Sequence, residues 1–388
     1  MIQPIRKRVA QANNIDTTKY FHTLLIDGNN ILKIASVDHK MNNDGKEYGI
    51  IITSLRLIGE ILNKKDFDYC VIAFDGEQSG ILRYQYYKEY KANRDKNYEQ
   101  HEDEALERYM KRYRDFQKFV ISKSRENAPT ESEDESFKRQ KGILKQILQE
   151  LCIRQYEFDR VEGDDIISYY VKNKKDNERV VIVSSDKDLT QLISDTVIVY
   201  NPRKKKFITK KNAVEEIGII PENIVLEKII CGDVSDNIKG VKGVGNKTLS
   251  DLFPQIKTEK IDLSFIMRRS RELLEERKAN KKKPLKSLEN ILNGITDGCQ
   301  GDKLYEINQK IIDLSEPLLT EEAIKTMDDE FYAPIDTSEL SVKNVYEIIG
   351  ENNMNDISDE TKFGNLLGPF DKIQMMENKR YERFKQEN

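Results

Sequence analysis

No apolar stretch of the 388-residue chain approaches membrane-spanning length, and Met1 to Asn14 contain neither an apolar core nor a cleavage site. These absences argue against a membrane protein and a secreted one, so we expect a soluble protein of the cytoplasm without a membrane partner. Cysteine is also scarce. The four residues lack the spacing of a metal site, which predicts reduced thiols in a reducing compartment: Cys70, Cys152, Cys231 and Cys299.

Neither sign of charge is in clear excess, because 64 Lys and Arg residues face 68 Asp and Glu residues and the formal net charge is −4. The excess of positive charge expected of a nucleic-acid-binding protein is therefore missing. The acids, however, gather in short motifs and the bases in separate runs, so local fields of either sign remain. Length and composition predict a globular protein with one large domain and appendages, or with two modest domains.

Short apolar runs that end at an acid or a turn recur through the first two thirds of the chain. They predict strands at His22–Ile26, Tyr69–Phe74, Val180–Ser185 and Thr196–Tyr200, and helical patterns between them predict helices at Gly49–Leu62, Ile143–Leu151 and Asp165–Val171. This alternation predicts an α/β fold whose central, mainly parallel sheet is covered by helices on both faces. Because such sheets form their polar sites beyond the carboxyl ends of the strands, Asp27, Asp75 and Asp186 are expected to converge.

Further acids lie in short motifs such as Glu162-Gly163-Asp164-Asp165, which opens a predicted helix. Taken alone, each motif is more often a helix cap or a structural feature than a metal site. Taken together they match a site for two divalent cations about 3.5–4 Å apart, which requires many hard oxygen ligands. We therefore predict a metal site that involves nine acids: Asp27, Asp75, Glu162, Asp164, Asp165, Asp186, Asp188, Asp233 and Asp236.

The run from Gly232 to Thr248 begins with carboxylates and closes with glycine turns, and Lys247 and Thr248 then open a predicted helix. Acids beside an anion-cradling loop suit a phosphate backbone with metal bound at one end, which indicates a nuclease. A nucleotide-binding P-loop does not fit, because a residue separates Gly245 from Lys247 and a helix, not a strand, precedes the loop.

Two segments leave alternatives open. Residues from about Arg83 to Arg139 interrupt the strand–helix alternation with a Tyr- and Lys-rich stretch, a charged helix predicted at Glu102–Lys123 and an acidic link at Glu126–Ser136. This insertion is either a helical hairpin packed on the domain or an element that projects over the site. The basic stretch Arg268–Lys286 is either a solvated helix and loop or a patch that contacts a nucleic-acid backbone.

Six motifs, in order along the chain, resemble the 5′-nuclease (flap endonuclease) superfamily, which includes the 5′→3′ exonuclease domain of bacterial DNA polymerase I. They are Leu25–Gly28, Ala73–Asp75, Tyr90–Arg94, Val161–Asp165, Ser185–Leu192 and Gly232–Thr248. The similarity covers roughly residues 22–255. Within the superfamily the chain looks most similar to the ribonuclease H of T-even bacteriophages, through the Ser79-Gly80 pair before Arg83, the Tyr-rich approach to Lys91 and the basic hairpin 202–206.

The resemblance implies a PIN-like 5′-nuclease fold with four parts. An N-terminal extension (residues 1–20) precedes a catalytic core (21–200), which contains a helical arch insertion at about 83–140. A helix–hairpin–helix region that binds duplexes (201–255) and a helical C-terminal region (256–388) follow.

The resemblance also implies residue roles. Lys91 and Arg94 would contact the scissile phosphate and act in catalysis with Asp27, Asp164 and Asp186. Asp165 and Asp236 would reach the metal ions through water, and the other seven acids would bind them directly. Tyr90 would stack on a terminal base. The residues expected to contact nucleic acid are Arg83, Tyr90, Lys91, Arg94, Lys242, Gly243, Gly245, Lys247 and Thr248.

The function so implied is that of a 5′→3′ exonuclease or flap endonuclease that requires two Mg²⁺ ions, for which Mn²⁺ would substitute, with K⁺ at the helix–hairpin–helix loop. Its substrates would be DNA and RNA–DNA duplexes with 5′ ends or flaps. A monomer that removes RNA primers in phage DNA replication, in the host cytoplasm and beside a single-strand-binding protein or sliding clamp, is the sharper expectation. The alternatives are a PIN-like single-strand ribonuclease, which has no use for Asp233–Thr248, and a structure-specific DNA-binding protein without catalysis, which would lack acids.

Overall fold

The computed structural model describes residues 20–42, 44–92, 131–297, 301–354, 357 and 359–387. Arg94, Cys299 and the helix predicted at Glu102–Lys123 lie outside these residues, so those predictions are not tested. The three described cysteines are unpaired thiols, of which Cys70 and Cys152 are buried. No helix in the described ranges is both long and apolar enough to cross a membrane.

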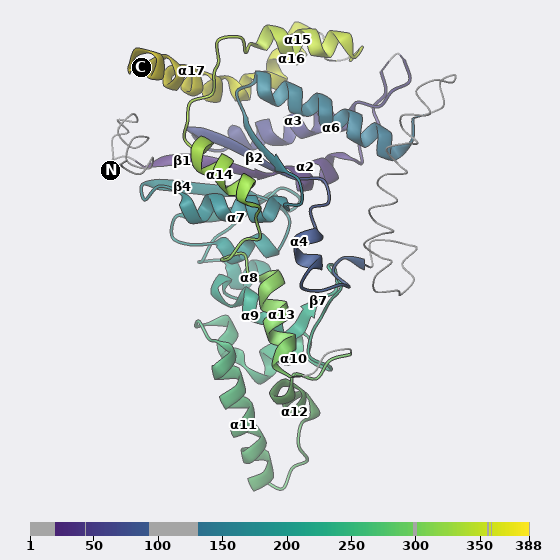
Figure 1. Ribbon diagram of the computed structural model, residues 1–388, viewed down its shortest axis with the longest axis vertical. Helices are drawn as coiled ribbons and strands as arrows, with labels where there is room; N and C mark the ends of the chain where they lie inside the picture. Colours follow the sequence, from purple (N-terminus) through teal and green to yellow (C-terminus); the bar gives the residue numbers. More distant parts are fainter. Residues whose placement is uncertain are drawn as a thin grey trace.

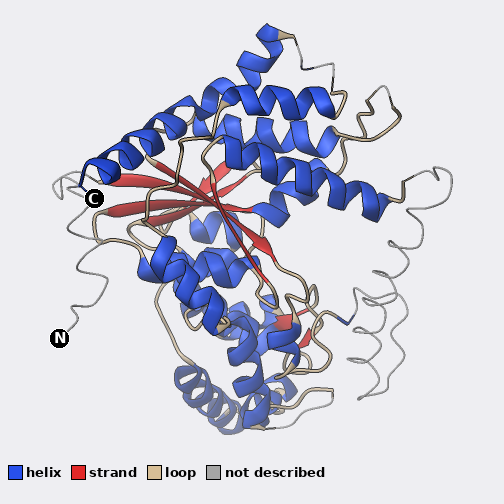
Figure 2. Ribbon diagram, turned by 45° about the horizontal axis from the view of Figure 1, so that its top comes forward, coloured by secondary structure: helices blue, strands red, loops and turns tan. Residues whose placement is uncertain are grey.

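A six-stranded sheet forms the centre of the fold, with the strand order β3-β2-β1-β4-β5-β6. Its strands are β1 (Phe21–Asp27), β2 (Tyr69–Asp75), β3 (Arg154–Phe158), β4 (Glu178–Val183), β5 (Val197–Asn201) and β6 (Lys206–Ile208). All neighbours are parallel except β5 and β6. Helices lie on both sides of the twisted sheet (Figure 2), which confirms the predicted α/β class.

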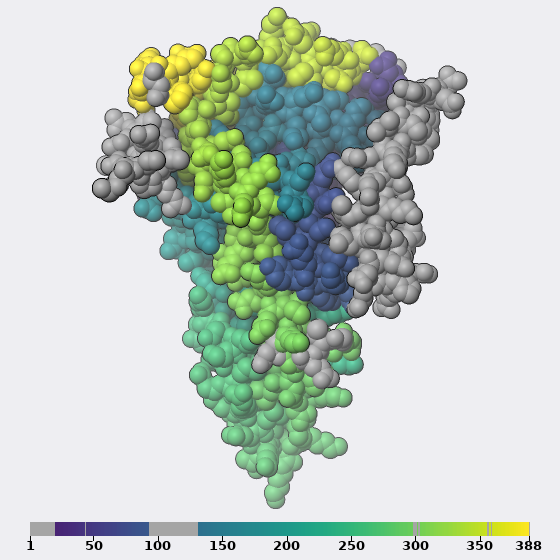
Figure 3. All heavy atoms as spheres, viewed as in Figure 1, coloured from purple at the N-terminus to yellow at the C-terminus, as the bar shows by residue number. Residues whose placement is uncertain are grey.

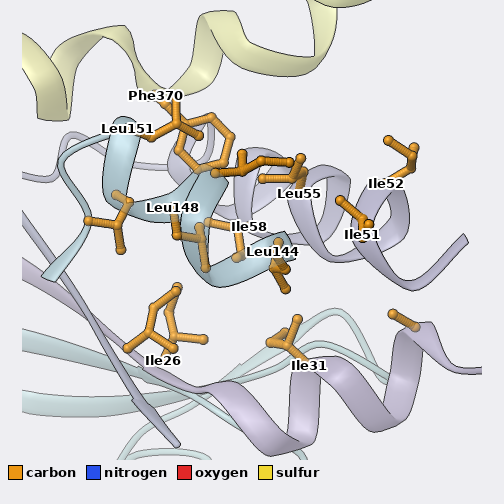
Figure 4. Close-up of a cluster of buried hydrophobic side chains, with 14 of the residues drawn as sticks. Ile26, Ile31, Ile51, Ile52, Leu55, Ile58, Leu144, Leu148, Leu151 and Phe370 are labelled. Carbon is orange, nitrogen blue, oxygen red and sulfur yellow. The ribbon is translucent and has the colours of Figure 1, made fainter. Parts of the chain in front are cut away.

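One face of the sheet is covered by α2 (Gly28–Ala35), α3 (Gly49–Leu62) and α6 (Glu133–Glu150). Figure 4 shows the core that they share, with Ile26 of β1 and Ile31 of α2 below Leu55 of α3 and Leu148 of α6. These side chains are at most 2% exposed, and burial of each contributes roughly 1.5–3 kcal/mol before the entropy cost of folding.

Helix α6 begins ten residues earlier than the sequence patterns suggested. Ser132 and Glu135 form a capping box, in which the Glu135 amide donates to the Ser132 hydroxyl (3.3 Å) and the Ser132 amide donates to the Glu135 carboxylate (3.0 Å). Residues 133–140 therefore belong to a helix of the core. Assigning them to the acidic link and the insertion was wrong.

The opposite face is covered by α7 (Gly163–Asn173) and by α14 (Glu321–Glu330) from the C-terminal part of the chain. The ring of Tyr170 in α7 meets that of Phe331, which follows α14, with a centroid distance of 4.8 Å. Both side chains are buried.

The elements below the sheet in Figure 1 share a separate hydrophobic cluster. It includes Ile230, Val244, Leu249, Ile266 and Leu288. The elements of this lower part are α8 (Ala213–Ile217), α9 (Ile224–Cys231), β7 (Gly232–Asp233), β8 (Ile238–Lys239), α10 (Asn246–Leu252), α11 (Leu263–Ala279), α12 (Lys286–Asn293) and α13 (Asp302–Ile312). They form the narrow end of the molecule in Figure 3.

The helices of residues 256–388 lie in three places. Helices α11 to α13 extend the lower part, and α14 packs under the sheet. The last helices, α15 (Val342–Glu351), α16 (Glu360–Leu367) and α17 (Asp371–Glu387), add a layer over α3 and α6 at the top of Figure 1. Phe370, buried between these layers, contributes to the core in Figure 4.

Candidate active site

Carboxyl groups from separate elements meet at the carboxyl ends of the central strands. Asp27 and Asp75 are the last residues of the adjacent strands β1 and β2, Asp186 follows β4, and Asp164 lies in the first turn of α7. Burial raises the pKa of Asp164 well above its usual range, and the charges of Asp186, Asp27 and Asp75 raise it further. Four of the predicted metal acids are thus near enough to repel one another.

Amide and hydroxyl groups hold two of these carboxylates in place. Asp27 accepts hydrogen bonds from the Ser184 hydroxyl (2.7 Å) and the Asn30 amide (2.9 Å). Asp75 accepts from the Asn29 side chain (2.6 Å) and the Gly163 amide (2.7 Å). Neither asparagine was predicted as a site residue, although both directly follow the Asp27-Gly28 motif.

The pKa of Asp27 is raised to about 7, first by burial and then by the charges of Asp75 and Asp186. An unfolded aspartate titrates near pH 3.9, so between about pH 4 and pH 7 the folded protein holds a proton at Asp27 that the unfolded chain has released. This proton favours folding. Its contribution is complete below about pH 4 and is lost as the pH rises through 7.

We expect Asp27→Asn to remove this pH dependence. Asparagine also caps helices well, so the N-terminus of α2 is kept. In EDTA, the unfolding free energy of the variant relative to the wild type should rise from pH 4 to pH 7 by up to about 1.4 kcal/mol per pH unit. Urea titrations at several pH values measure it. The control Asp195→Asn changes a side chain that is 90% exposed and should give no comparable slope; parallel curves for Asp27→Asn would contradict the assignment.

A second group of acids, also predicted, lies beside the first. Single carboxylate oxygens of Asp188, Asp233 and Asp236 lie within 4.8 Å of one another. The Asp188 amide donates to the Asp186 carboxylate (2.9 Å), which joins the two groups. The donors are all carboxylate oxygens, the ligand type that Mg²⁺ and Mn²⁺ prefer, so the residues fit divalent cations.

A cavity of about 920 Å³ opens beside these acids. Its wall includes Asp186, Asp188 and Asp233, the basic residue Lys33, and Gly245 at the start of α10. Acids of both groups and the start of α10 therefore face one space.

The base of the insertion packs against Glu162 through buried polar contacts. The Arg83 guanidinium, 5% exposed, forms ion pairs with Asp165 (2.5 Å) and Glu162 (2.8 Å), and Lys91 binds Glu162 (2.5 Å). The Tyr90 hydroxyl, on a side chain that is 7% exposed, donates to Glu162 (3.0 Å). Although burial opposes ionisation, Arg83 and Lys91 hold the pKa of Glu162 below its usual value.

These contacts differ from two predictions. Arg83 and Tyr90 were expected to touch nucleic acid, but both are buried and bind carboxylates, and Arg83 also donates to the Ile311 carbonyl, so the structure does not present them to a strand. Asp165 is buried and accepts hydrogen bonds from Arg83 and from the Leu318 amide (2.9 Å). These contacts are compatible with the water-mediated role expected of Asp165, which stays a prediction.

The same segment is hydrogen-bonded to the turn between β7 and β8. The Lys91 amide donates to the Asp236 carbonyl (2.9 Å), and the Asn237 side chain donates to the Glu89 carbonyl (2.8 Å). Both Lys91 and Asn237 have left-handed backbones, with φ of 56° and 57°. Lys91 is thus placed beside the acids by backbone contacts as well as by its side chain.

Helices α9 and α10 flank the short β7–β8 hairpin and the loop after it. Gly232 and Gly240 lie so close that a Cβ on either would fall 2.4 Å from the amide nitrogen of the other. Gly243 has a φ of +77°, and Gly245 occupies the cap position of α10. Lys242 and Lys247 are exposed, although Lys242 pairs with Asp297 (2.9 Å), and Thr248 is half-buried.

Comparison with known proteins gives consistent matches. A family model described as "5'-3' exonuclease, N-terminal resolvase-like domain" matches residues 22–218. DNA polymerase I of Bacillus subtilis is 29% identical over 239 residues, which are 60% of this chain and 23% of that protein. A 5'-3' exonuclease of Aquifex aeolicus is 32% identical over 164 residues, 37% of this chain and 55% of that protein. The chain thus spans from about a quarter to about half of these relatives.

The T5 D15 protein, crystallised with metal ions, shares the fold, with a TM-score of 0.52 at 19% identity over 84% of this chain and 99% of that one. The family model covers more than half of the present chain. The chain therefore belongs to the 5′-3′ exonuclease family, as the sequence motifs predicted.

Proposed function

We propose that this protein is a Mg²⁺-dependent 5′-nuclease that hydrolyses phosphodiester bonds at or near the 5′ ends of DNA and RNA–DNA duplexes, flaps included. The observation that carries this proposal is the convergence of Asp27, Asp75, Asp164 and Asp186, whose charges act on one another across four elements. Buried carboxylates that repel one another gain most from a divalent cation.

Five acids, Asp164 among them, would hold one cation, and Asp188, Asp233 and Asp236 a second, as the oxygen-only donor set allows. When bound, two divalent cations supply activation of water and stabilisation of charge on the attacking and leaving oxygens of a phosphodiester. The T5 D15 protein, which shares this fold, was crystallised with metal ions. The five acids are Asp27, Asp75, Glu162, Asp164 and Asp186.

The protein supplies positive charge at the edge of this site. Lys91, whose ammonium binds Glu162, is half-buried with 24% of its side chain exposed, so it can reach a strand end held against the acids. A lysine ammonium there would stabilise negative charge that develops on the phosphate oxygens. Arg94 is proposed for the same role, although it lies outside the described residues.

The α9–β7–β8–α10 unit is proposed as a helix–hairpin–helix element that binds duplex DNA. Backbone amides around Gly243 and Gly245, with Lys247 and Thr248 at the start of α10, suit phosphates and carry no base recognition. The exposed Lys242 lies on the same loop. A K⁺ ion on this loop stays a prediction.

Lys247→Ala should weaken duplex binding to a similar extent for every sequence, because a phosphate contact is lost. The slope of log affinity against log salt concentration should fall by about one. Fluorescence anisotropy at several salt concentrations, with Ca²⁺ in place of Mg²⁺, measures both quantities. Lys325→Ala, an exposed lysine on α14, is the matched control and should bind like the wild type. A loss that depends on base sequence would rule out the proposed contact.

A substrate panel tests the activity itself. The wild type is given 5′-labelled flap, nicked and blunt DNA and an RNA-primed duplex, with Mg²⁺ or with EDTA. We expect Mg²⁺-dependent release of short products from 5′ ends. Cleavage confined to the interior of single strands would favour a PIN-like ribonuclease, and binding without cleavage would favour a DNA-binding protein without catalysis.

Removal of RNA primers in phage replication is the finer form of this proposal. It is supported only by the likeness of the sequence motifs to phage ribonuclease H. Faster release from the RNA-primed duplex than from the DNA duplex would favour it, and equal rates would favour a general 5′-nuclease. The same proposal takes the protein as a monomer that acts beside a single-strand-binding protein or sliding clamp.

A further inference from the structure

Lys228 places an ammonium group inside the second group of acids. It lies on α9, its side chain is 10% exposed, and its Nζ donates to Asp188 and to Asp233, the latter at 2.5 Å. These are two of the three carboxylates whose oxygens lie within 4.8 Å of one another. The ammonium thus contacts two of the three carboxylates that would bind the second cation.

Lys228 is not needed to hold these carboxylates in place. The adjacent pair Lys187–Glu227 (2.7 Å) already ties the loop of Asp188 to α9. Asp233 is positioned independently, because its carboxylate accepts hydrogen bonds from the amide (2.8 Å) and the hydroxyl (2.6 Å) of Ser235. Removal of Lys228 should therefore leave the geometry of the acids largely intact while it removes one positive charge.

A divalent cation and the Lys228 ammonium cannot both make close contacts with the same oxygens, because like charges at such distances repel strongly in a partly buried site. Any cation that binds Asp188 and Asp233 must displace the ammonium and break its two ion pairs. The free energy of breaking these pairs is subtracted from the affinity for the cation.

We propose that Lys228 is a tethered competitor that keeps the affinity of the Asp188–Asp233–Asp236 site for divalent cations low. The inference rests on the proposed function, since it takes these acids as a cation site. Lys228 lines the same cavity of about 920 Å³, so its displaced ammonium has space to move into. Lys228 thereby sets how readily the second cation binds, without holding the acids in place.

The test is calorimetric titration of the purified 388-residue chain with Mn²⁺ at pH 7.5. The wild type should bind one Mn²⁺ more tightly than the other. In Lys228→Met, the weaker site should bind about tenfold more tightly, which corresponds to about 1.4 kcal/mol. Lys228→Gln, which keeps a donor without the charge, should show the same direction. Lys228→Arg, which keeps the charge, should resemble the wild type.

Lys33→Met is the matched control, because Lys33 lines the same cavity and its substitution removes the same charge. It should leave the weaker site within about twofold of the wild type. If Lys228→Met and Lys228→Gln fold, as circular dichroism would show, and bind Mn²⁺ no more tightly than the wild type, the inference is wrong although the proposed function stands. A wild type that binds no Mn²⁺ would overturn both.

Discussion

Asp186→Asn should reduce the rate of phosphodiester cleavage by about 10³-fold or more while duplex binding is kept. Asp186 joins the two groups of acids, since its carboxylate accepts the Asp188 amide (2.9 Å) and its charge acts on Asp27 and Asp164. Loss of one ligand from a two-cation site removes several kcal/mol of stabilisation from the transition state, and each 1.36 kcal/mol is a tenfold change in rate. Single-turnover cleavage of a 5′-flap substrate in Mg²⁺ measures the effect.

The Asp186→Asn variant should also stay folded. The Asp186 charge raises the pKa of Asp27, Asp164 and Asp188, so its removal relieves repulsion among buried carboxyls. We expect the unfolding free energy in EDTA to equal or exceed that of the wild type, which separates a catalytic defect from an unstable protein. Asp195→Asn, at an exposed position, controls for the loss of one carboxylate and should cleave normally. Turnover within about tenfold of the wild type would remove Asp186 from the site.

The central strands and the converging acids were readable from the sequence because both depend on local patterns. Continuous apolar runs such as Tyr69–Phe74 occur where a strand is buried on both faces, and the acid that ends each run lies at the edge of the sheet. The Gly49–Leu62 pattern likewise gave the bounds of α3, because a buried helix keeps a strict helical spacing of apolar residues.

The edge strands β3 and β6 were missed for a related reason. The segment Arg154–Phe158 has only one buried side chain, Tyr156, so it shows no apolar run in the sequence although it pairs with β2 along its whole length. The start of α6 was missed although the capping box at Ser132 and Glu135 is a sequence signal. An acidic stretch interpreted as a linker was in fact the first turn of a helix.

Lys228 and the buried role of Arg83 could not be predicted from local sequence. Lys228 and its partner Asp188 are 40 residues apart in the sequence, and Arg83 and its partner Asp165 are 82 residues apart. A lysine or arginine on an amphipathic segment usually faces solvent, and only the packing of α9 and of the insertion base turns these two inward. Sequence patterns predicted which acids gather. The positively charged side chains that neutralise them, Lys228 and Arg83, reach them through tertiary contacts that the sequence does not reveal.

Arg83→Ala should destabilise the folded protein by about 3–5 kcal/mol, the range found when one partner of a buried ion pair is removed. The guanidinium binds Asp165 through two nitrogens (2.5 and 3.0 Å), Glu162 (2.8 Å) and the Ile311 carbonyl (2.9 Å). Asp165 is 1% exposed, so without Arg83 its charge would be left buried beside Glu162. Urea unfolding in EDTA measures the loss.

The double variant Arg83→Met/Asp165→Leu should recover much of this stability. Both charged partners are then gone, so no unpaired charge is buried at position 165, and Glu162 keeps its ion pair with Lys91. Arg268→Ala, at a side chain that is 66% exposed, should change stability by no more than about 0.5 kcal/mol. The result also decides between two roles for Arg83. If Arg83→Ala is as stable as the wild type but binds duplexes more weakly, the guanidinium contacts nucleic acid, and the buried ion pair is not its main role.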